Sequence, residues 1–158
     1  MKRFLAFAAL SVLIFAVATR LLAQNPAVGT WKLNLAKSKY SPGPGPKSMT
    51  RTVESQGAKV KYSFEGVAAD GTTIAYSFTV SYDGNDYPVT GSGVPSGVDA
   101  IAIKQLNPNS YEATLKKAGQ PVLISKTQIS KDGKVTTITQ TSPAGKSPVK
   151  NIAVYEKQ

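Results

Sequence analysis

The side chains that most often perform nucleophilic catalysis and bind transition metals are missing from this sequence. Its 158 residues include no histidine and no cysteine. Ser–His and Cys–His nucleophile pairs are therefore excluded, as are the usual zinc and copper sites. We predict no metal site, no cofactor and no enzymatic activity for this chain.

The acidic residues supply little of the missing chemistry. Asp83, Asn85 and Asp86 are residue types that bind calcium, but their spacing differs from that of an EF-hand loop, so the sequence favours a turn. Asp99 and Glu112 would form a glycosidase-like carboxylate pair across a hairpin if they lay close enough together, and the sequence does not give their separation.

The tyrosines are more informative. The chain has seven tyrosines, five phenylalanines and one tryptophan. Tyrosines that alternate with polar residues fall on apolar strand faces: Tyr62, Tyr76, Tyr82, Tyr87, Tyr111 and Tyr155. Because a buried hydroxyl needs a hydrogen-bond partner, these residues indicate either a cavity that holds water or an amphipathic ligand, or hydroxyls that emerge at the rims of a barrel.

Arg51 shares its alternation with Met49 and Val53. Its side chain therefore points either into the apolar interior or, at a frayed strand, to solvent. An inward Arg51 would place a cation among the tyrosines. The predicted cavity-lining residues are Arg51, Tyr62, Phe64, Tyr76, Phe78, Tyr111 and Tyr155.

These side chains lie on runs of two-residue alternation that turn signals separate. The turn signals are Asp70-Gly71, Asp83-Gly84-Asn85, Asn107-Pro108-Asn109 and residues 131–134. Tyr87 and Val89 mark one short strand, and Val122 and Ile124 begin another whose phase slips before Ile129, which suggests a bulge. Short strands in hairpin succession are typical of β-sandwiches and barrels.

The strand faces favour a barrel. One face is apolar and the other is rich in Lys, Ser, Thr and Glu, so the apolar face must be covered. Closure into a barrel does this and removes the sheet edges, although a two-sheet sandwich would also cover it. The charged face must lie outside, which argues against an outer-membrane barrel. We predict an all-β, antiparallel up-and-down barrel of about 8–10 strands, wide enough to hold a small ligand.

Both ends of this predicted barrel resemble a known superfamily. "GTWKLNL" resembles the opening strand of the calycins, which include the lipocalins and the fatty-acid-binding proteins. The resemblance implies that Gly29 and Trp31 form a structural plug at one barrel end. "NIAVYEKQ" resembles the closing strand of fatty-acid-binding proteins. With "DGNDYPVTG", the chain also resembles small secreted lipocalin-like bacterial proteins whose function is not established.

Two departures from this resemblance bear on function. Pro42, Pro44 and Pro46 occupy the place where fatty-acid-binding proteins have a helical lid, and they exclude such a lid here. The resemblance implies an Arg-x-Tyr carboxylate anchor on the last strand, where this chain has Ala153 and Tyr155. An inward Arg51 would replace the missing arginine.

The N-terminal residues predict export. Lys2 and Arg3 precede an apolar run over residues 4–17, which is short for a membrane span. We predict a signal peptide over residues 1–23, cleaved after Ala18 or Ala23, and a single domain over residues 24–158. Arg20 leaves open the alternative of an uncleaved anchor. We expect the protein to be periplasmic or extracellular, with no membrane span in its mature form.

The charge and the barrel together limit the partner classes. The formal net charge is +10, from lysines spread along the chain rather than from clustered arginines, so we do not expect nucleic acid binding. We expect a monomer that binds a small apolar or amphipathic molecule in its barrel. The alternative is an interaction or inhibitor module with a solid core, which binds a protein or an anionic polymer through its loops and lysine-rich surface.

Overall fold

The computed structural model describes residues 25–158, so the predicted signal peptide lies outside the described residues. Two short 3-10 helices, η1 and η2, interrupt a succession of strands. The elements are β1 (Gly29–Leu33), η1 (Leu35–Lys37), β2 (Ser48–Gln56), β3 (Lys59–Val67), β4 (Thr73–Val80), β5 (Asp83–Pro88), β6 (Thr90–Ser92), η2 (Pro95–Gly97), β7 (Ala100–Asn107), β8 (Ser110–Lys117), β9 (Gln120–Ile129), β10 (Val135–Thr141) and β11 (Lys150–Lys157).

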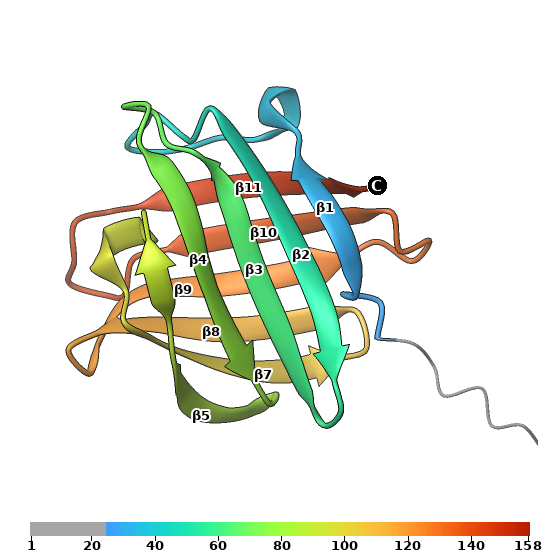
Figure 1. Ribbon diagram of the computed structural model, residues 1–158. Coiled ribbons are helices and arrows are strands. Elements are labelled where there is room, and N and C mark those ends of the chain that lie inside the picture. Colours follow the sequence, from blue (N-terminus) through green and yellow to red (C-terminus); the bar gives the residue numbers. More distant parts are fainter. Residues whose placement is uncertain (1–24) are drawn as a thin grey trace, which may run out of the picture.

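The strands form a single antiparallel sheet that curls into a nearly closed barrel. Across residues 25–158 its eleven strands have the order β5-β7-β8-β9-β10-β11-β1-β2-β3-β4-β6. In Figure 1, β1–β4 cross in front of β7–β11, and the interior lies between these two walls. Antiparallel pairing of β1 with β11 joins the walls on one side. The prediction of an all-β, antiparallel up-and-down barrel is confirmed.

The strand count exceeds the prediction because one extended segment divides between the two sheet edges. β5 pairs with β7 from Asp83 onward, whereas β6 pairs with β4, where Thr90 faces Ser77. The turn predicted at Asp83-Gly84-Asn85 lies within β5 rather than between strands: the Asp83 carboxylate accepts a hydrogen bond from the Asn85 N–H over 2.9 Å, and the β5–β7 register shifts between Asp83 and Asp86. Because this segment changes partner near Val89, it bridges the two edges and nearly closes the barrel.

β9 contains an irregularity, but not at the predicted place. The β8–β9 register shifts so that Leu115 faces Leu123 while Lys116 faces Pro121, which leaves Val122 as the extra residue. Proline cannot donate a ladder hydrogen bond and is common at such bulges. Val122 still packs against the core, and beyond the bulge Leu123 is buried while Ile124 is only partly buried.

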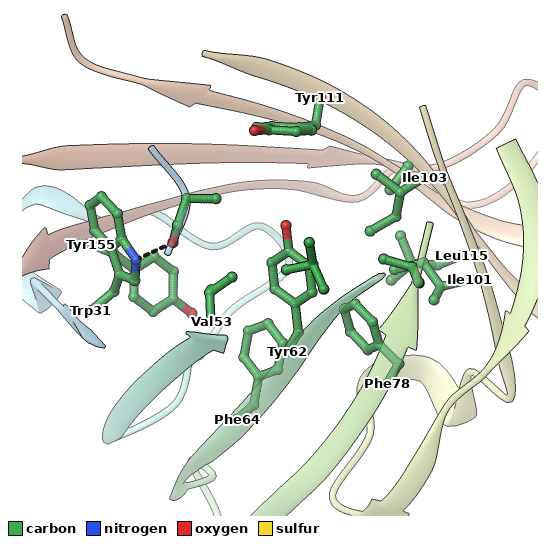
Figure 2. Packing of buried hydrophobic residues seen from close by; sticks show 14 of the residues in the cluster. Trp31, Val53, Tyr62, Phe64, Phe78, Ile101, Ile103, Tyr111, Leu115 and Tyr155 are labelled. Carbon is green, nitrogen blue, oxygen red and sulfur yellow. Dashed lines mark hydrogen bonds between the residues drawn. The ribbon is translucent and has the colours of Figure 1, made fainter. Parts of the chain in front are cut away.

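Trp31 lies at the end of the barrel where the described chain begins. Its side chain is fully buried, and the indole N–H donates to the Ala27 carbonyl oxygen over 2.8 Å (Figure 2). Asn25 joins this end to the far wall, since its amide donates to the Tyr82 hydroxyl over 3.2 Å and accepts from the Tyr111 hydroxyl over 3.1 Å. Residues 25–28 thus lie across this closed end, and truncating a tryptophan buried like Trp31 costs about 3–5 kcal/mol of stability.

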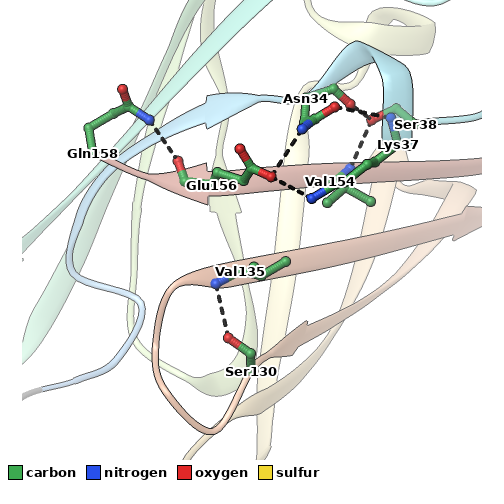
Figure 3. A network of polar contacts seen from close by, with 8 residues as sticks. All are labelled: Asn34, Lys37, Ser38, Ser130, Val135, Val154, Glu156 and Gln158. Atoms are coloured by element: carbon green, nitrogen blue, oxygen red, sulfur yellow. Dashed lines mark hydrogen bonds and ion pairs between the residues drawn. The ribbon is translucent and has the colours of Figure 1, made fainter.

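A proline-rich loop, residues 38–47, follows η1 at the opposite end. Lys39 and Ile152 exchange two backbone hydrogen bonds of 2.8 and 2.7 Å, and the Lys150 N–H donates to the Ser41 carbonyl oxygen over 2.7 Å. Asn34 and Lys37 both donate to the Glu156 carboxylate (Figure 3). The loop is therefore fastened to β11, in agreement with the prediction of a loop rather than a helical lid. No helix within residues 25–158 has the length and apolarity needed to span a membrane.

Candidate binding cavity

A cavity of about 270 Å³ lies inside the barrel. This volume is near the lower limit of ligand pockets, which are about 300–1,000 Å³, so it suits a small molecule. The seven predicted cavity-lining residues all contribute to its walls: Arg51, Tyr62, Phe64, Tyr76, Phe78, Tyr111 and Tyr155. Ligand binding by these residues stays a prediction.

Strand register places the central residues of the cavity in one row. Trp31 on β1 faces Arg51 on β2, which faces Phe64 on β3, which in turn faces Tyr76 on β4. Residues that face one another across strands point to the same side of the sheet. Along β2, Arg51 lies at mid-height between two other inward residues, Val53 towards the closed end and Met49 towards the proline-rich loop.

Four aromatic rings line the wall formed by β3 and β4. Phe64 stacks on Tyr76 with ring centroids 4.7 Å apart, and Tyr62 stacks on Phe78 at 5.0 Å. The rings of each pair lie face to face, so the four side chains form a packed aromatic wall of the cavity.

Arg51 points into the barrel, which decides between the two orientations that the sequence left open. Its side chain is 2% exposed, and Nη2 donates to Thr136 Oγ1 over 3.3 Å. The guanidinium carbon lies 5.2 Å from the Trp31 ring centroid and 5.3 Å from that of Tyr155. Nε has no hydrogen-bond partner among the residues that the structure describes. Burial lowers the pKa of Arg51 from its ordinary value, but arginine is basic enough to keep its charge.

No carboxylate balances this buried charge within the described part of the chain. The three ion pairs there are Lys37–Glu156, Lys116–Asp86 and Lys126–Glu112, and all six side chains are at least partly exposed. No Asp or Glu side chain of residues 25–158 lines the cavity, whose one charged group is Arg51. A buried cation without a counter-ion is unfavourable and attracts an anion.

The tyrosine hydroxyls divide between the two arrangements predicted for them. The hydroxyls of Tyr62 and Tyr82 lie 2.7 Å apart near the closed end. In contrast, those of Tyr76 and Tyr155 make no hydrogen bond to another residue between 25 and 158, although both residues line the cavity. Burial raises the pKa of Tyr62, Tyr76 and Tyr155, so these hydroxyls are neutral donors at neutral pH. Tyr87 packs at the edge of the core on the same side as Ile101, and its exposed hydroxyl donates to Asp83.

The acidic candidates do not form a site. The Asp99 N–H bonds the Lys116 carbonyl oxygen, four residues along β8 from Glu112, which separates the two acids by about 13 Å. A glycosidase pair needs a separation below about 9.5 Å. Asp83 is taken up by the hydrogen bonds of β5, and no three His, Cys, Asp or Glu side chains of residues 25–158 gather as metal ligands would.

Sequence reasoning missed two polar residues that hold the cavity together. Thr136 is fully buried and receives the Arg51 hydrogen bond, and Asn25 joins the closed end to Tyr82 and Tyr111. Thr136 alternates with Ile138 on a threonine-rich strand, so its inward direction was available from the pattern. Nothing in the local sequence marks Asn25, because its partners are far away along the chain.

Comparison with solved structures places this barrel among known folds. No protein-family model matches the sequence, and no curated protein matches it. The structure is similar to that of zebrafish ileal bile acid-binding protein complexed with cholic acid, with a TM-score of 0.50, 11% sequence identity, and coverage of 84% of this chain and 99% of that chain. The fold is calycin-like. At this identity the similarity concerns the fold alone.

A redesigned β-barrel, mFAP0, bound to DFHBI, is 12% identical over 84% of this chain and 99% of that chain, with a TM-score of 0.41. Within this calycin-like barrel, Gly29 and Trp31 occupy the closed end, in the place that the sequence resemblance implies for a plug. Ala153 lines the cavity where that resemblance implies an arginine, and the cavity cation comes instead from Arg51 on β2.

Proposed function

We propose that this protein is an exported binding protein that holds a small apolar or amphipathic molecule inside its barrel. The observation that carries the proposal is the cavity of about 270 Å³ lined by aromatic and aliphatic side chains. Enclosed apolar cavities with a few polar groups are the usual form of small-molecule sites. The cholic acid bound to the zebrafish protein of similar fold supports the same class of function.

Export is part of this proposal and rests on residues 1–23, with their basic start and apolar run. A periplasmic or extracellular location would give the barrel access to molecules of the cell envelope or the surroundings. Edman sequencing of the protein recovered outside the cytoplasm tests this part, with a new N-terminus after Ala18 or Ala23 as the expected result. Recovery from the cytoplasm with Met1 retained would contradict it.

The interaction module considered as an alternative requires a solid core. The hollow interior favours a ligand instead. The lysine-rich outer surface remains compatible with weak attraction to anionic polymers, which needs no cavity.

Titration with the neutral fluorescent probe N-phenyl-1-naphthylamine tests the binding function. We expect saturable binding of one probe per chain. Ala113 lines the cavity on β8, whereas Ala102 on β7 lies on the opposite face of the sheet, so these two alanines provide a matched pair. Ala113→Phe should weaken binding about tenfold or more by filling the cavity, and Ala102→Phe should leave it unchanged.

Circular dichroism would establish that both variants fold, and Ala153→Leu supplies a second cavity-filling change if Ala113→Phe does not. Equal binding by the filled and outer-face variants would place the probe outside the barrel and contradict the proposal.

A further inference from the structure

We propose that the natural ligand carries an acidic group, a carboxylate or a sulfonate, which binds the Arg51 guanidinium at mid-height in the barrel. This inference rests on the proposed binding function. It names the chemical class of the ligand as an amphipathic anion. The proposal rests on the position of Arg51, its free donors and the absence of any competing acid.

The charge balance of the cavity is the first support. Arg51 is 2% exposed and belongs to none of the ion pairs of residues 25–158. Burying a lone cation costs free energy unless an anion or several hydrogen bonds compensate it. The described chain supplies one long hydrogen bond, from Thr136, and the faces of the Trp31 and Tyr155 rings. An anionic ligand would complete this balance.

The unused donors are the second support. A guanidinium has five N–H donors, and the one side-chain bond that Arg51 makes leaves most of them unused. The Tyr155 ring lies beside the guanidinium, and Tyr76 lies in the same row two strands away. Both tyrosine hydroxyls lack a partner among residues 25–158. Arginine and neutral hydroxyls together match the oxygens of a carboxylate or a sulfonate.

The position of Arg51 also predicts how the ligand lies. Met49, the next inward residue of β2, is nearer the proline-rich loop, and the cavity wall at that level includes Pro42 and Pro46. The acidic group would therefore enter first and reach Arg51, while the apolar body lies on the loop side of Arg51, against Met49 and Pro46.

This arrangement differs from the anchor that the sequence resemblance implies. That anchor uses an arginine on the last strand, where this chain has Ala153. Here the cation comes from β2 and is held from β10 through Thr136, so the proposal follows from this chain's own packing.

Two probes that share an anilinonaphthalene body provide the test. 1-Anilinonaphthalene-8-sulfonate carries a sulfonate, and N-phenyl-1-naphthylamine lacks it. We expect the wild-type protein to bind the anionic probe about tenfold more tightly or better, because a hydrogen-bonded charge contributes that much. In Arg51→Met this ratio of affinities should fall to about one. Lys104→Met removes a surface charge on the outer face of β7 and should keep the wild-type ratio.

Thermal unfolding of the ligand-free variants separates a binding role from a structural one. Removing an unpaired buried charge should leave the melting temperature of Arg51→Met unchanged or raise it. A structural arginine would instead lower the melting temperature and weaken both probes together, which would overturn the proposal. If Arg51→Met does not fold, Arg51→Lys, which keeps the charge, replaces it in the test and should retain the preference for the anionic probe; loss of that preference in a folded Arg51→Lys would overturn the proposal.

The two proposals fail differently. If the wild-type protein binds the two probes equally and Arg51→Met changes neither affinity, the acid-binding proposal is wrong while the binding function stands. If the wild-type protein binds neither probe, the binding function itself is contradicted.

Discussion

At the scale of single residues, the inward direction of Arg51 is the feature on which the chemistry of the cavity depends. Trp31 and Tyr155 present ring faces to the guanidinium, and Thr136 accepts its one hydrogen bond. Cation–π contacts of this kind contribute about 0.5–2 kcal/mol each, which offsets part of the cost of burying the charge. An anionic ligand would compensate the rest of this cost.

The buried tyrosines predict alkaline instability. Burial raises the pKa of Tyr62, Tyr76 and Tyr155 above the value of about 10 for an unfolded chain. The stability from their neutral, buried hydroxyls is therefore fully present below about pH 10 and is lost above it, where the unfolded state releases these protons first. Tyrosinate absorbance from these residues should appear together with the loss of the circular dichroism signal.

Two variants check the assignment of this delayed absorbance. Tyr76→Phe should reduce it and move alkaline unfolding to higher pH. Tyr87→Phe, which removes an exposed hydroxyl, should leave unchanged the tyrosinate absorbance that appears together with unfolding. Full ionisation of every tyrosine before any unfolding would show that the hydroxyls are not buried.

The side of the strand on which most of these residues lie could be predicted from sequence, because alternation alone assigns Tyr62, Phe64, Tyr76 and Phe78 to one face. The direction of Arg51 could not be fixed in this way, since a charged residue within an apolar alternation is equally typical of a frayed strand. Its burial depends on Thr136, Trp31 and Tyr155, which come together only when β10, β11, β1 and β2 pair.

At the scale of elements, the hairpin turns could be predicted from the sequence, but the places where a strand segment changes its pairing partner could not. Asp70-Gly71, Asn107-Pro108-Asn109 and residues 131–134 all lie between successive strands, as their local conformational preferences require. The division of residues 83–92 between β7 and β4 depends on which sheet edge each half meets, and this information is not local. The bulge at Val122 lies earlier in β9 than predicted, because Pro121 cannot donate a hydrogen bond to the ladder.

Gly66 tests the close approach of β2 and β3 near the open end. A Cβ at this position would meet the Ser48 carbonyl oxygen and lie 3.0 Å from Met49 Cα, both backbone atoms that cannot rotate away. Gly66→Ala should therefore destabilise the protein by about 1–3 kcal/mol in chemical denaturation.

Gly57 provides the comparison for that variant. It lies in the β2–β3 turn with φ of +63° and open space around it. Asparagine tolerates this conformation, so Gly57→Asn should change stability by about 0.5 kcal/mol or less. Equal effects of the two substitutions would mean that the strands are not in close contact at Gly66.

At the scale of the whole molecule, the hollow interior follows from the number of strands and from the side chains that face inward. About eight strands already enclose room for one small ligand, and the eleven strands within residues 25–158 form a wider barrel. Residues 25–28 cross one end, and the loop of residues 38–47 is fastened to β11 at the other. The barrel class was predictable from alternation, whereas the cavity volume depends on how the side chains pack across the interior.

A crystal structure of the protein with 1-anilinonaphthalene-8-sulfonate is the most direct test of a ligand-binding interior. We expect one probe inside the barrel, with its sulfonate on Arg51 and its rings on the loop side of Arg51, against Met49 and Pro46. The result that would contradict this expectation is an interior filled by the side chains of β3, β4, β7 and β8, with the probe bound only to lysines on the outer surface.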